Sequence, residues 1–504
     1  MIPRLFALLL LALSACTAPA QDPAPELPGP PHKRRGINLS KACHYSREVP
    51  FADVFRLSAP WIHQRAGSTQ PWSLDEPLEL TDDGWPVLKD GRGAATILLR
   101  SLAGKYPAGR YVCTYRGTGE LKLDWDAAVA SEAPGRLELD VTPSDQGILL
   151  KIVSQDPQDP IRDVKVWLPG YEDGSRVWNQ AFLDAVRPFG TVRFMDWQRT
   201  NNSPLVRWQD RTLPTPPTQD REQGVAYELL IALCNELDAD LWFCVPHQAD
   251  DAFLREAAAL VAQELEPELT VYLEYSNEVW NGTFQQRKWV EANAPGGSFA
   301  EKYAGRCKRA FAAFAQALPP ERLVRVVATQ AANAGYSGQV IRAFAPGEAD
   351  AFAPAYYVAL PQPEVKAIDP DADGEAIVAQ LRASWEQRQK PALEKIAALA
   401  SEAGLGLVAY EGGQHLVNYD KGAANRPALT RAQTAPAIEG LYADLFAHWR
   451  SLGGGVFCAY SLASAQDARS GSWGHLDSVY DRRGDAPKYR ALLEWWKPAG
   501  SDAK

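Results

Sequence analysis

The feature that most constrains the fold of this 504-residue chain is a regular alternation of strand-like and helix-like segments from about residue 191 onward. The helical stretches carry apolar residues at three- and four-residue spacing. Because helices of this length separate the strands, parallel pairing through βαβ units is expected. The predicted strands span residues 191–196, 241–246, 269–276, 323–329, 349–357, 405–410 and 455–460.

An eighth strand at residues 36–39 (GINL) completes the count needed for a closed barrel. Eight strand–helix units predict an α/β fold of the (β/α)₈ TIM-barrel class, whose active sites lie at the carboxyl ends of the strands. A doubly wound open sheet is the alternative. It fits less well, because no glycine-rich phosphate-binding turn follows any of the strands.

Residues 72–168, between the first and second barrel strands, have a different pattern. Short alternating strands separated by turns predict an antiparallel β-sandwich inserted near the N-terminus. The barrel would then comprise residues 36–71 and 169–498. Both a carbohydrate-binding role and a packing role for the inserted domain remain open. The strands predicted in it span residues 95–100, 110–115, 120–125, 136–141, 147–153 and 163–167.

The N-terminus has the pattern of a bacterial export signal. Arg4 precedes an apolar segment at residues 5–12, which is too short to span a membrane. The sequence Leu-Ser-Ala-Cys ending at Cys16 resembles a lipobox, in which the cysteine is acylated. This predicts a lipoprotein signal peptide at residues 1–15. Cleavage after residues 18–20 is the rival interpretation.

Residues 16–35 are rich in proline and alanine and predict a flexible tether. The expected location is the cell envelope, with membrane contact only through the lipid on Cys16, or the periplasm or extracellular space. The net charge of −10 and the absence of a basic run beyond residues 33–35 argue against a nucleic-acid partner. A monomer is expected.

The cysteines and tryptophans give less information about function than the strand pattern does. None of the six cysteines besides Cys16 shows metal-site spacing, and most are expected to be small buried hydrophobes. The 16 tryptophans are explained either by burial or by rings that stack on sugars. Trp197, Trp280 and Trp473 are the candidates for such platforms, since they follow predicted strands.

Two glutamates end apolar strands on opposite sides of the predicted barrel mouth. Asn277 and Glu278 follow the fourth strand, and Glu411 follows the seventh. Cleavage of a glycosidic bond needs one neutral carboxyl group as proton donor and a second, ionised one. Carboxyl groups about 5–5.5 Å apart would mean retention of configuration, and a wider gap would mean inversion. The two glutamates at strand ends across the barrel mouth therefore predict a glycosidase site.

These residues resemble glycoside hydrolase clan A, and within it the cellulase-type family 5. The resemblance implies that Glu278 is the acid/base, Glu411 the nucleophile, and that Asn277 binds the substrate 2-hydroxyl group. It also implies that Arg193 on the second strand lies near the nucleophile, and that His247 ends the third strand in the site.

A tyrosine on the sixth strand is expected to hydrogen-bond the nucleophile. Strand alternation allows only one of Tyr356 and Tyr357 to point inward, and Tyr356 is preferred. The chain departs from the family at its eighth strand, where Tyr460 and Ser461 stand and a tryptophan comes only at Trp473. This departure concerns the binding of substrate more than the chemistry.

The expected protein is an exported, retaining glycoside hydrolase that acts on a β-linked oligo- or polysaccharide, such as cellulose or mannan, and needs no metal or organic cofactor. The main alternative is a cell-surface lipoprotein that binds carbohydrate on the same barrel without cleaving it. A structural envelope lipoprotein and an inverting glycosidase are narrower alternatives. The fold alone does not identify the glycan.

Overall fold

The structure is a computed structural model that describes residues 30–65, 78–89, 91–467 and 471–495. The predicted signal peptide, the lipidation at Cys16 and most of the predicted tether lie outside the described residues. At the end of the tether, Pro31–Arg34 form a short 3₁₀ helix that leads directly into the first strand. Among the described residues, no helix is both long and apolar enough to cross a bilayer.

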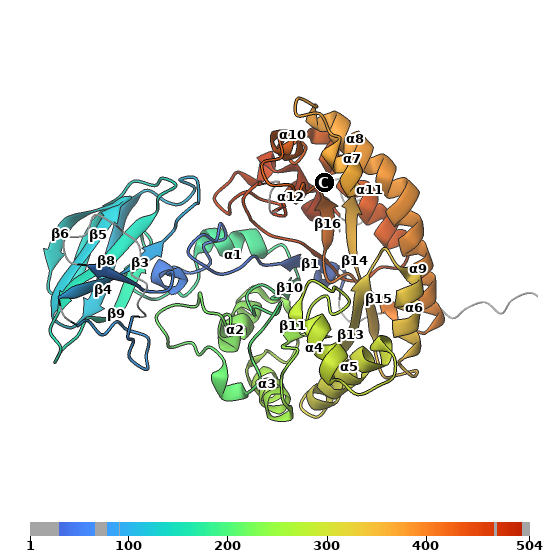
Figure 1. The fold of residues 1–504 in the computed structure, drawn as a ribbon, viewed down its shortest axis with the longest axis horizontal. Coiled ribbons are helices and arrows are strands. Elements are labelled where there is room, and N and C mark those ends of the chain that lie inside the picture. The colour runs from blue at the N-terminus through green and yellow to red at the C-terminus, as the bar shows by residue number, and fades with distance from the viewer. Residues whose placement is uncertain (1–29, 66–77, 90, 468–470, 496–504) are drawn as a thin grey trace, which may run out of the picture.

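A parallel sheet forms the centre of the larger part of the molecule (Figure 1). Its strands, in spatial order, are β15 (Gly406–Leu407), β14 (Ala351–Ala359), β13 (Leu323–Gln330), β12 (Val271–Tyr275), β11 (Asp240–Val245), β10 (Thr191–Arg193), β1 (Arg35–Asn38) and β17 (Phe457–Ala459). A further strand, β16 (Gly412–His415), pairs in parallel with the end of β14.

Hydrogen bonds join the two ends of this sheet. Gly455 N donates to Leu407 O at 2.8 Å, Ala409 N donates to Val456 O at 2.8 Å, and Cys458 N donates to Ala409 O at 2.9 Å. The segment that follows β15 therefore pairs with the start of β17. This confirms the predicted parallel α/β fold and is consistent with a (β/α)₈ barrel.

The strands are buried on both faces, as expected for a parallel sheet covered by helices. All residues of β11 and β12 are buried. Leu241 and Leu273 belong to the large cluster shared with the helices, while Trp242 and Tyr272 belong to a separate cluster inside the barrel. The rings of Trp242 and Tyr272 stack there with centroids 5.3 Å apart.

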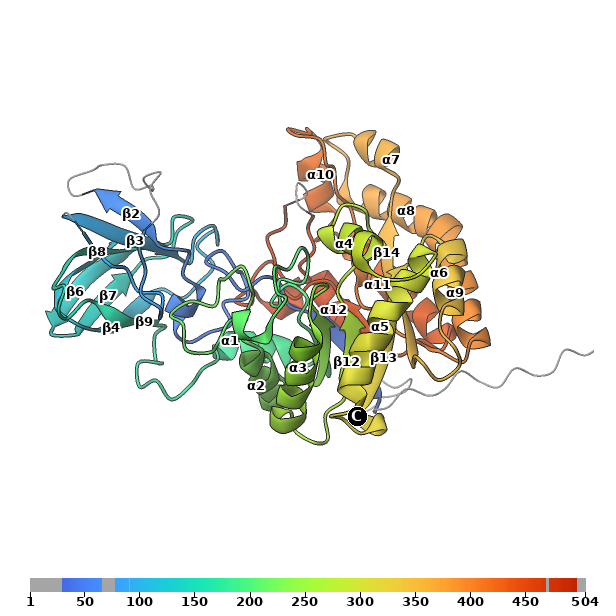
Figure 2. The same ribbon diagram turned by 60° about the horizontal axis from the view of Figure 1, so that its bottom comes forward.

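Helices surround the sheet in Figures 1 and 2. In α5 the buried residues recur at three- and four-residue spacing from Ala300 to Phe314, and Ser298 starts the helix with a capping box. A π-helical turn, Trp385–Gln389, interrupts the predicted helix 375–403. The main helices are α2 (Tyr227–Leu237), α3 (Asp251–Glu264), α4 (Gln285–Asn293), α5 (Phe299–Ala315), α6 (Ala334–Arg342), α8 (Gly374–Ser384), α9 (Lys390–Glu402), α11 (Pro436–Ser451) and α12 (Pro487–Glu494).

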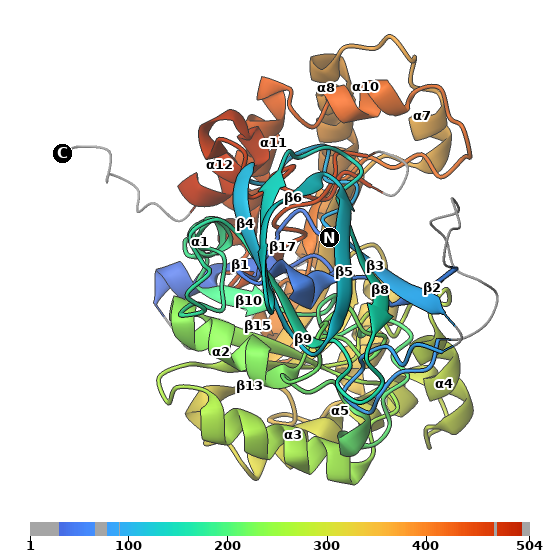
Figure 3. The same ribbon diagram turned by 90° about the vertical axis from the view of Figure 1, so that its left-hand side faces the viewer.

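Two four-stranded antiparallel sheets are inserted between β1 and β10 and lie beside the barrel (Figures 1 and 3). One has the order β2 (Ile62–Arg65), β3 (Arg92–Leu98), β8 (Ile148–Gln155), β5 (Gly119–Trp125). The other has the order β6 (Ala127–Ala133), β7 (Arg136–Val141), β4 (Gly109–Arg116), β9 (Arg162–Trp167). Lys105 in the loop between β3 and β4 contacts Asp477 and Asp481 of the barrel at 2.6 and 2.9 Å.

The six cysteines in the described part of the chain are all buried and carry free thiols. This agrees with their expected role as small buried hydrophobes. Burial raises the pKa of these thiols, as at Cys43, where it reaches about 12.

Candidate active site

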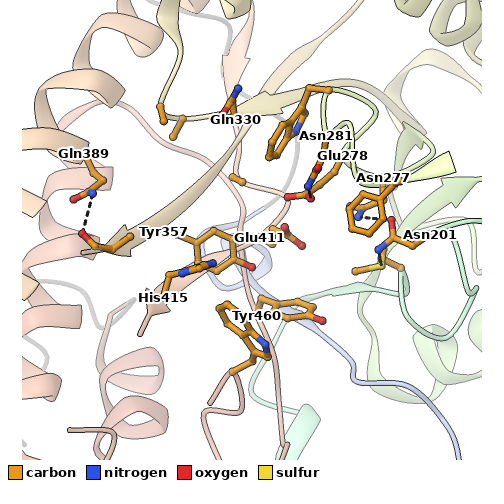
Figure 4. A pocket seen from close by; sticks show the side chains of 18 of the residues that line it. Asn201, Asn277, Glu278, Asn281, Gln330, Tyr357, Gln389, Glu411, His415 and Tyr460 are labelled. Carbon is orange, nitrogen blue, oxygen red and sulfur yellow. Dashed lines mark hydrogen bonds between the residues drawn. The ribbon is translucent and has the colours of Figure 1, made fainter. Parts of the chain in front are cut away.

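A pocket of about 620 Å³ opens at the carboxyl ends of the parallel strands (Figure 4). This volume is typical of sites for small ligands or short saccharide segments. The residues that line it come from the ends of β12, β13 and β14 and from the segments after β10, β15 and β17. They include Asn201, Asn277, Glu278, Trp280, Asn281, Phe284, Gln330, Tyr357, Gln362, Gln389, Glu411, His415, Tyr419, Tyr460 and Trp473.

The chain leaves β12 through two residues in the left-handed backbone region. Ser276 has φ +61° and Glu278 has φ +43°. Non-glycine residues rarely adopt this conformation, and each costs about 1–3 kcal/mol unless its surroundings hold it. Gln286 Nε2 donates to Asn277 O at 2.7 Å, and Asn281 Nδ2 donates to Glu278 Oε2 at 2.9 Å. These bonds hold the turn and aim the Glu278 carboxyl group.

Glu411 enters the pocket from the short segment between β15 and β16. Its backbone oxygen accepts a hydrogen bond from Tyr356 N at 2.9 Å. The next residue, Gly412, lies against β14 and β17, and a Cβ atom there would be 2.5 Å from both Tyr356 O and the Phe457 ring. Only glycine fits this approach. In Figure 4 the carboxyl groups of Glu278 and Glu411 point toward one another.

A buried guanidinium group underlies the pocket. Arg193 Nη1 lies 3.6 Å from Glu411 Oε2. Its Nη2 lies 2.9 Å from Glu274 Oε2 and donates to Asn277 Oδ1 at 2.7 Å. Asn38 Oδ1 accepts from Nη1 at 2.9 Å. Arg193 therefore connects the nucleophile candidate to the residue beside Glu278, and its side chain is fully buried.

Burial and the adjacent Glu278 carboxyl raise the pKa of Glu411 well above its ordinary value, while the Arg193 charge opposes the rise. Because Arg193 Nη1 lies 3.6 Å from Glu411 Oε2, its positive charge favours the ionised form of this carboxyl group. The arrangement thus brings two carboxyl groups and one buried cation together at one pocket.

Aromatic side chains form much of the remaining wall. Tyr410 donates to Glu278 Oε1 at 3.5 Å and accepts from Trp280 Nε1 at 3.2 Å. Tyr460 donates to Asp196 Oδ2 at 2.8 Å. Trp280 and Trp473 both line the pocket, where a sugar ring can stack on them.

The Trp473 ring meets three other rings at the pocket edge-on. Its centroid is 5.7 Å from Tyr357, 5.8 Å from Tyr460 and 5.0 Å from His415. Burial lowers the pKa of His415, so this imidazole is neutral at pH 7. The wall around Trp473 is therefore aromatic and uncharged.

The preference for Tyr356 over Tyr357 is wrong. Tyr356 points away from the pocket, where its hydroxyl accepts from Trp385 Nε1 at 2.7 Å and lies 2.9 Å from His448 Nδ1. Tyr357 lines the pocket instead. Successive residues of a strand point to opposite faces, and the inward phase falls on Tyr357.

Trp197 and His247 are not among the pocket residues either. Trp197 is fully buried and packs against Phe51, Trp178, Phe182 and Phe194. His247 is also buried, with its ring 5.8 Å from that of Trp289. Burial and the Arg306 charge lower the pKa of His247 to about 4. Both side chains serve packing behind the strand ends.

The sequence reasoning missed several polar residues at the site, and three of them organise its hydrogen bonds. Asn201 Oδ1 accepts from Asn277 Nδ2 at 3.1 Å and from Gln286 Nε2 at 2.6 Å. Asn281 contacts Glu278, as described above. Glu274 lies inside the barrel and accepts from Trp242 Nε1 at 2.8 Å. A charged residue in the middle of the apolar run VYLEY was the available signal for a buried ion pair.

No protein-family model matches this sequence, and a search of curated proteins gave no match. Solved structures share parts of the fold. A GH51 arabinofuranosidase from Xanthomonas axonopodis pv. citri has 12% identity and a TM-score of 0.41 over 57% of this chain and 60% of that one, less than two thirds of its length. A xylanase from Cellvibrio japonicus has 13% identity and a TM-score of 0.38 over 64% and 93% of the two chains.

An endo-β-1,4-mannanase from Thermotoga petrophila has 11% identity and a TM-score of 0.36 over 64% of this chain and 74% of that one. Likenesses at these identities and TM-scores are too weak to assign a family or an activity to this chain. Within the part of the chain that the structure describes, no three His, Cys, Asp or Glu side chains are grouped so that they could hold a metal ion.

Proposed function

We propose that this protein is a retaining glycoside hydrolase that cleaves β-linked oligo- or polysaccharides, with Glu278 as general acid/base and Glu411 as nucleophile. The observation that carries the proposal is the facing carboxyl pair, with Arg193 3.6 Å from Glu411. Glycoside cleavage requires one ionised carboxyl group and one that carries a proton, and we assign the ionised role to Glu411 because Arg193 lies beside it.

In the first step, a Glu411 oxygen attacks the anomeric carbon while the glycosidic C–O bond breaks and the Glu278 proton moves to the departing oxygen. This gives a glycosyl ester on Glu411 and a free leaving-group alcohol. In the second step, the Glu278 carboxylate takes a proton from water as the water oxygen attacks the same carbon. The ester bond breaks, and a sugar of unchanged anomeric configuration leaves.

The closeness of the two carboxyl groups supports retention over inversion. They point toward one another in the pocket (Figure 4), and the Glu278 carboxyl group raises the pKa of Glu411. Inverting enzymes hold their carboxyl groups about 6.5–9.5 Å apart, to leave room for a water molecule. Arg193 and Asn201 hold the Asn277 side chain, and we infer for it the role that the resemblance to family 5 implies, a hydrogen bond to the substrate 2-hydroxyl group.

Hydrolysis of a panel of β-glycans by the purified protein tests the proposal. Glu411→Ala and Glu278→Ala should each lower kcat by at least about 10³-fold, while the exposed Glu402→Ala, a matched control, should not. Azide should restore product formation in Glu411→Ala as a glycosyl azide of inverted configuration. An unimpaired Glu411→Ala enzyme, or a first product of inverted configuration by proton NMR, would contradict the assignment.

We also infer that the two antiparallel sheets form an inserted β-sandwich, and that the protein is an exported monomer held to the membrane by a lipid on Cys16. The lipobox-like sequence and the Pro/Ala-rich tether support this location. Incorporation of labelled palmitate that is lost in Cys16→Ala tests the anchor. Equal membrane retention of the variant would count against it.

A further inference from the structure

A buried lysine lies behind the pocket wall that carries Trp473. Lys488, at the start of α12, is 2% exposed. Among the described residues no carboxylate lies within ion-pair distance of it; instead Nζ donates to Gln433 Oε1 at 2.9 Å, Ser472 O at 2.9 Å and Gln466 Oε1 at 3.5 Å. A buried ammonium group without a counter-ion is costly, so three converging acceptors need an explanation.

Two of these acceptors, Ser472 and Gln433, connect Lys488 to the segments that carry Trp473 and Glu411. Ser472 precedes Trp473, and its carbonyl also accepts from Gln414 Nε2 at 2.8 Å. Gln414 lies in β16, three residues after Glu411, and its Oε1 accepts from Gln433 Nε2 at 3.2 Å. Lys488, Gln414 and Gln433 thus enclose the Ser472 carbonyl group in a fully buried polar cluster.

The backbone around Ser472 determines where the Trp473 ring lies. Gly471 packs under this ring so closely that a Cβ atom there would be 2.0 Å from it. Trp473 O accepts from Ser461 N at 3.0 Å, next to the pocket residue Tyr460. A shift at Ser472 would therefore displace the ring from its contacts with Tyr357, His415 and Tyr460.

We propose that Lys488 is a positioning residue, which fixes the Ser472 carbonyl group and thereby holds Trp473 in place as the substrate-binding wall of the pocket. The effect of this role on KM rests on the proposed glycosidase function. Its effect on the position and hydrogen exchange of residues 472–476 does not. The three ammonium protons match the three acceptors, and an apolar side chain of similar length would leave all three oxygens without this donor.

The surroundings of Lys488 also make the cluster responsive to pH. Burial lowers the pKa of Lys488 to about 7, and Asp477 partly opposes this. Asp477 is itself paired with Lys105 and Arg47. His475 is fully buried, and burial together with the Lys488 charge lowers its pKa to about 3, so it is neutral.

Lys488 lines a second pocket of about 320 Å³ that shares no lining residue with the first. The other charged groups lining this second pocket are Asp481, Asp485 and Arg482, together with Lys105 and Asp477. As the pH rises through about 7, Lys488 loses one of its three protons. The wild-type KM should therefore rise on the alkaline side of pH 7.

Hydrogen exchange and kinetics on Lys488→Met test the proposal. The control is Lys33→Met, which removes another buried lysine, paired with Asp238 at the opposite end of the barrel. The backbone amides of residues 472–476 should exchange faster in Lys488→Met than in the wild type. Their exchange rates should not change in Lys33→Met. Unchanged exchange in both variants would overturn the proposal, and this readout holds even if no glycan is hydrolysed.

The kinetic arm compares Lys488→Met, Trp473→Ala and the double variant. Each single change should raise KM about fivefold to tenfold with kcat within twofold, and the double variant should show no further rise. The rise of KM above pH 7 should be absent in Lys488→Met. Additive effects would mean that Lys488 does not act through Trp473. If the Met variant fails to fold, Gln433→Met removes an acceptor from the same cluster and must give the same result.

Discussion

Arg193→Met is the substitution that most directly separates the electrostatic role of the buried guanidinium group from a packing role. Unit charges at the 3.6 Å separation of Arg193 and Glu411 interact by about 4.6 kcal/mol at an effective dielectric constant of about 20. Glu274 lies on the other side of the guanidinium group at 2.9 Å and offsets much of that charge.

Removing Arg193 should therefore raise the pKa of Glu411 by less than the pair energy alone would give. Because the proposed nucleophile must be ionised, the acid limb of the kcat/KM profile should move to higher pH. Activity at pH 5 should fall more than activity at pH 7. The variant leaves Glu274 buried without its partner, which should lower the free energy of unfolding by about 3–5 kcal/mol.

The assay is kcat/KM measured from pH 4 to 9, together with urea unfolding at pH 7. Arg193→Met/Glu274→Gln is the control, because it removes both charges and keeps the shape of the carboxyl group. The double variant should have a higher free energy of unfolding than Arg193→Met. The acid limb of its kcat/KM profile should still lie at higher pH than that of the wild type. An acid limb that does not move in Arg193→Met would refute the electrostatic role.

Four further substitutions test the placement of individual side chains. Tyr357→Phe should lower kcat/KM about tenfold because this ring lines the pocket, while Tyr356→Phe should leave kinetics unchanged and lower the free energy of unfolding by about 1 kcal/mol. Trp197→Ala should cost about 3–5 kcal/mol in urea unfolding with an unaltered KM, since the ring packs only against other side chains. The pKa of His247 is about 4 in the folded protein and about 6.5 when unfolded, so the wild type should lose about 3 kcal/mol of stability as the pH falls from 6.5 to 4. His247→Gln should flatten that dependence in urea unfolding at several pH values, and an unchanged slope would contradict the assignment.

The meeting of Glu278 and Glu411 in one pocket could be predicted because it depends on the order of elements alone. In a barrel of parallel strands, all carboxyl ends meet at one rim. Counting strands therefore placed Glu278 and Glu411 in one pocket without knowledge of any side-chain contact. The same reasoning identified Trp280 and Trp473, which line that pocket in the structure.

The orientation of side chains could not be predicted in the same way. Strand β14 is buried on both faces, so its hydrophobic pattern does not show which residues point into the barrel. The pattern therefore did not distinguish Tyr356 from Tyr357. Trp197 was expected to be exposed at a strand end. Its ring is instead covered by Phe51 and Trp178, which precede and follow the inserted sheets in the sequence. Such packing depends on which distant segments meet.

The polar cluster beneath the pocket was beyond sequence reasoning for a related reason. Arg193 bonds Glu274 and Asn38, which lie 81 and 155 residues away in the chain. Each residue taken alone is more often found at the surface. Only their convergence inside the barrel makes burial tolerable. The charged residue within VYLEY signals a buried ion pair, but no local pattern identifies Arg193 and Asn38 as members of the same cluster.

The left-handed backbone at Glu278 implies a trade-off between activity and durability. A glutamate at φ +43° carries a conformational cost that glycine or asparagine would not carry. A Glu278→Gly protein should then outlast the wild type on heating, despite the loss of the contact with Asn281. The proposed proton donor would occupy a position that selection for stability alone would give to another residue.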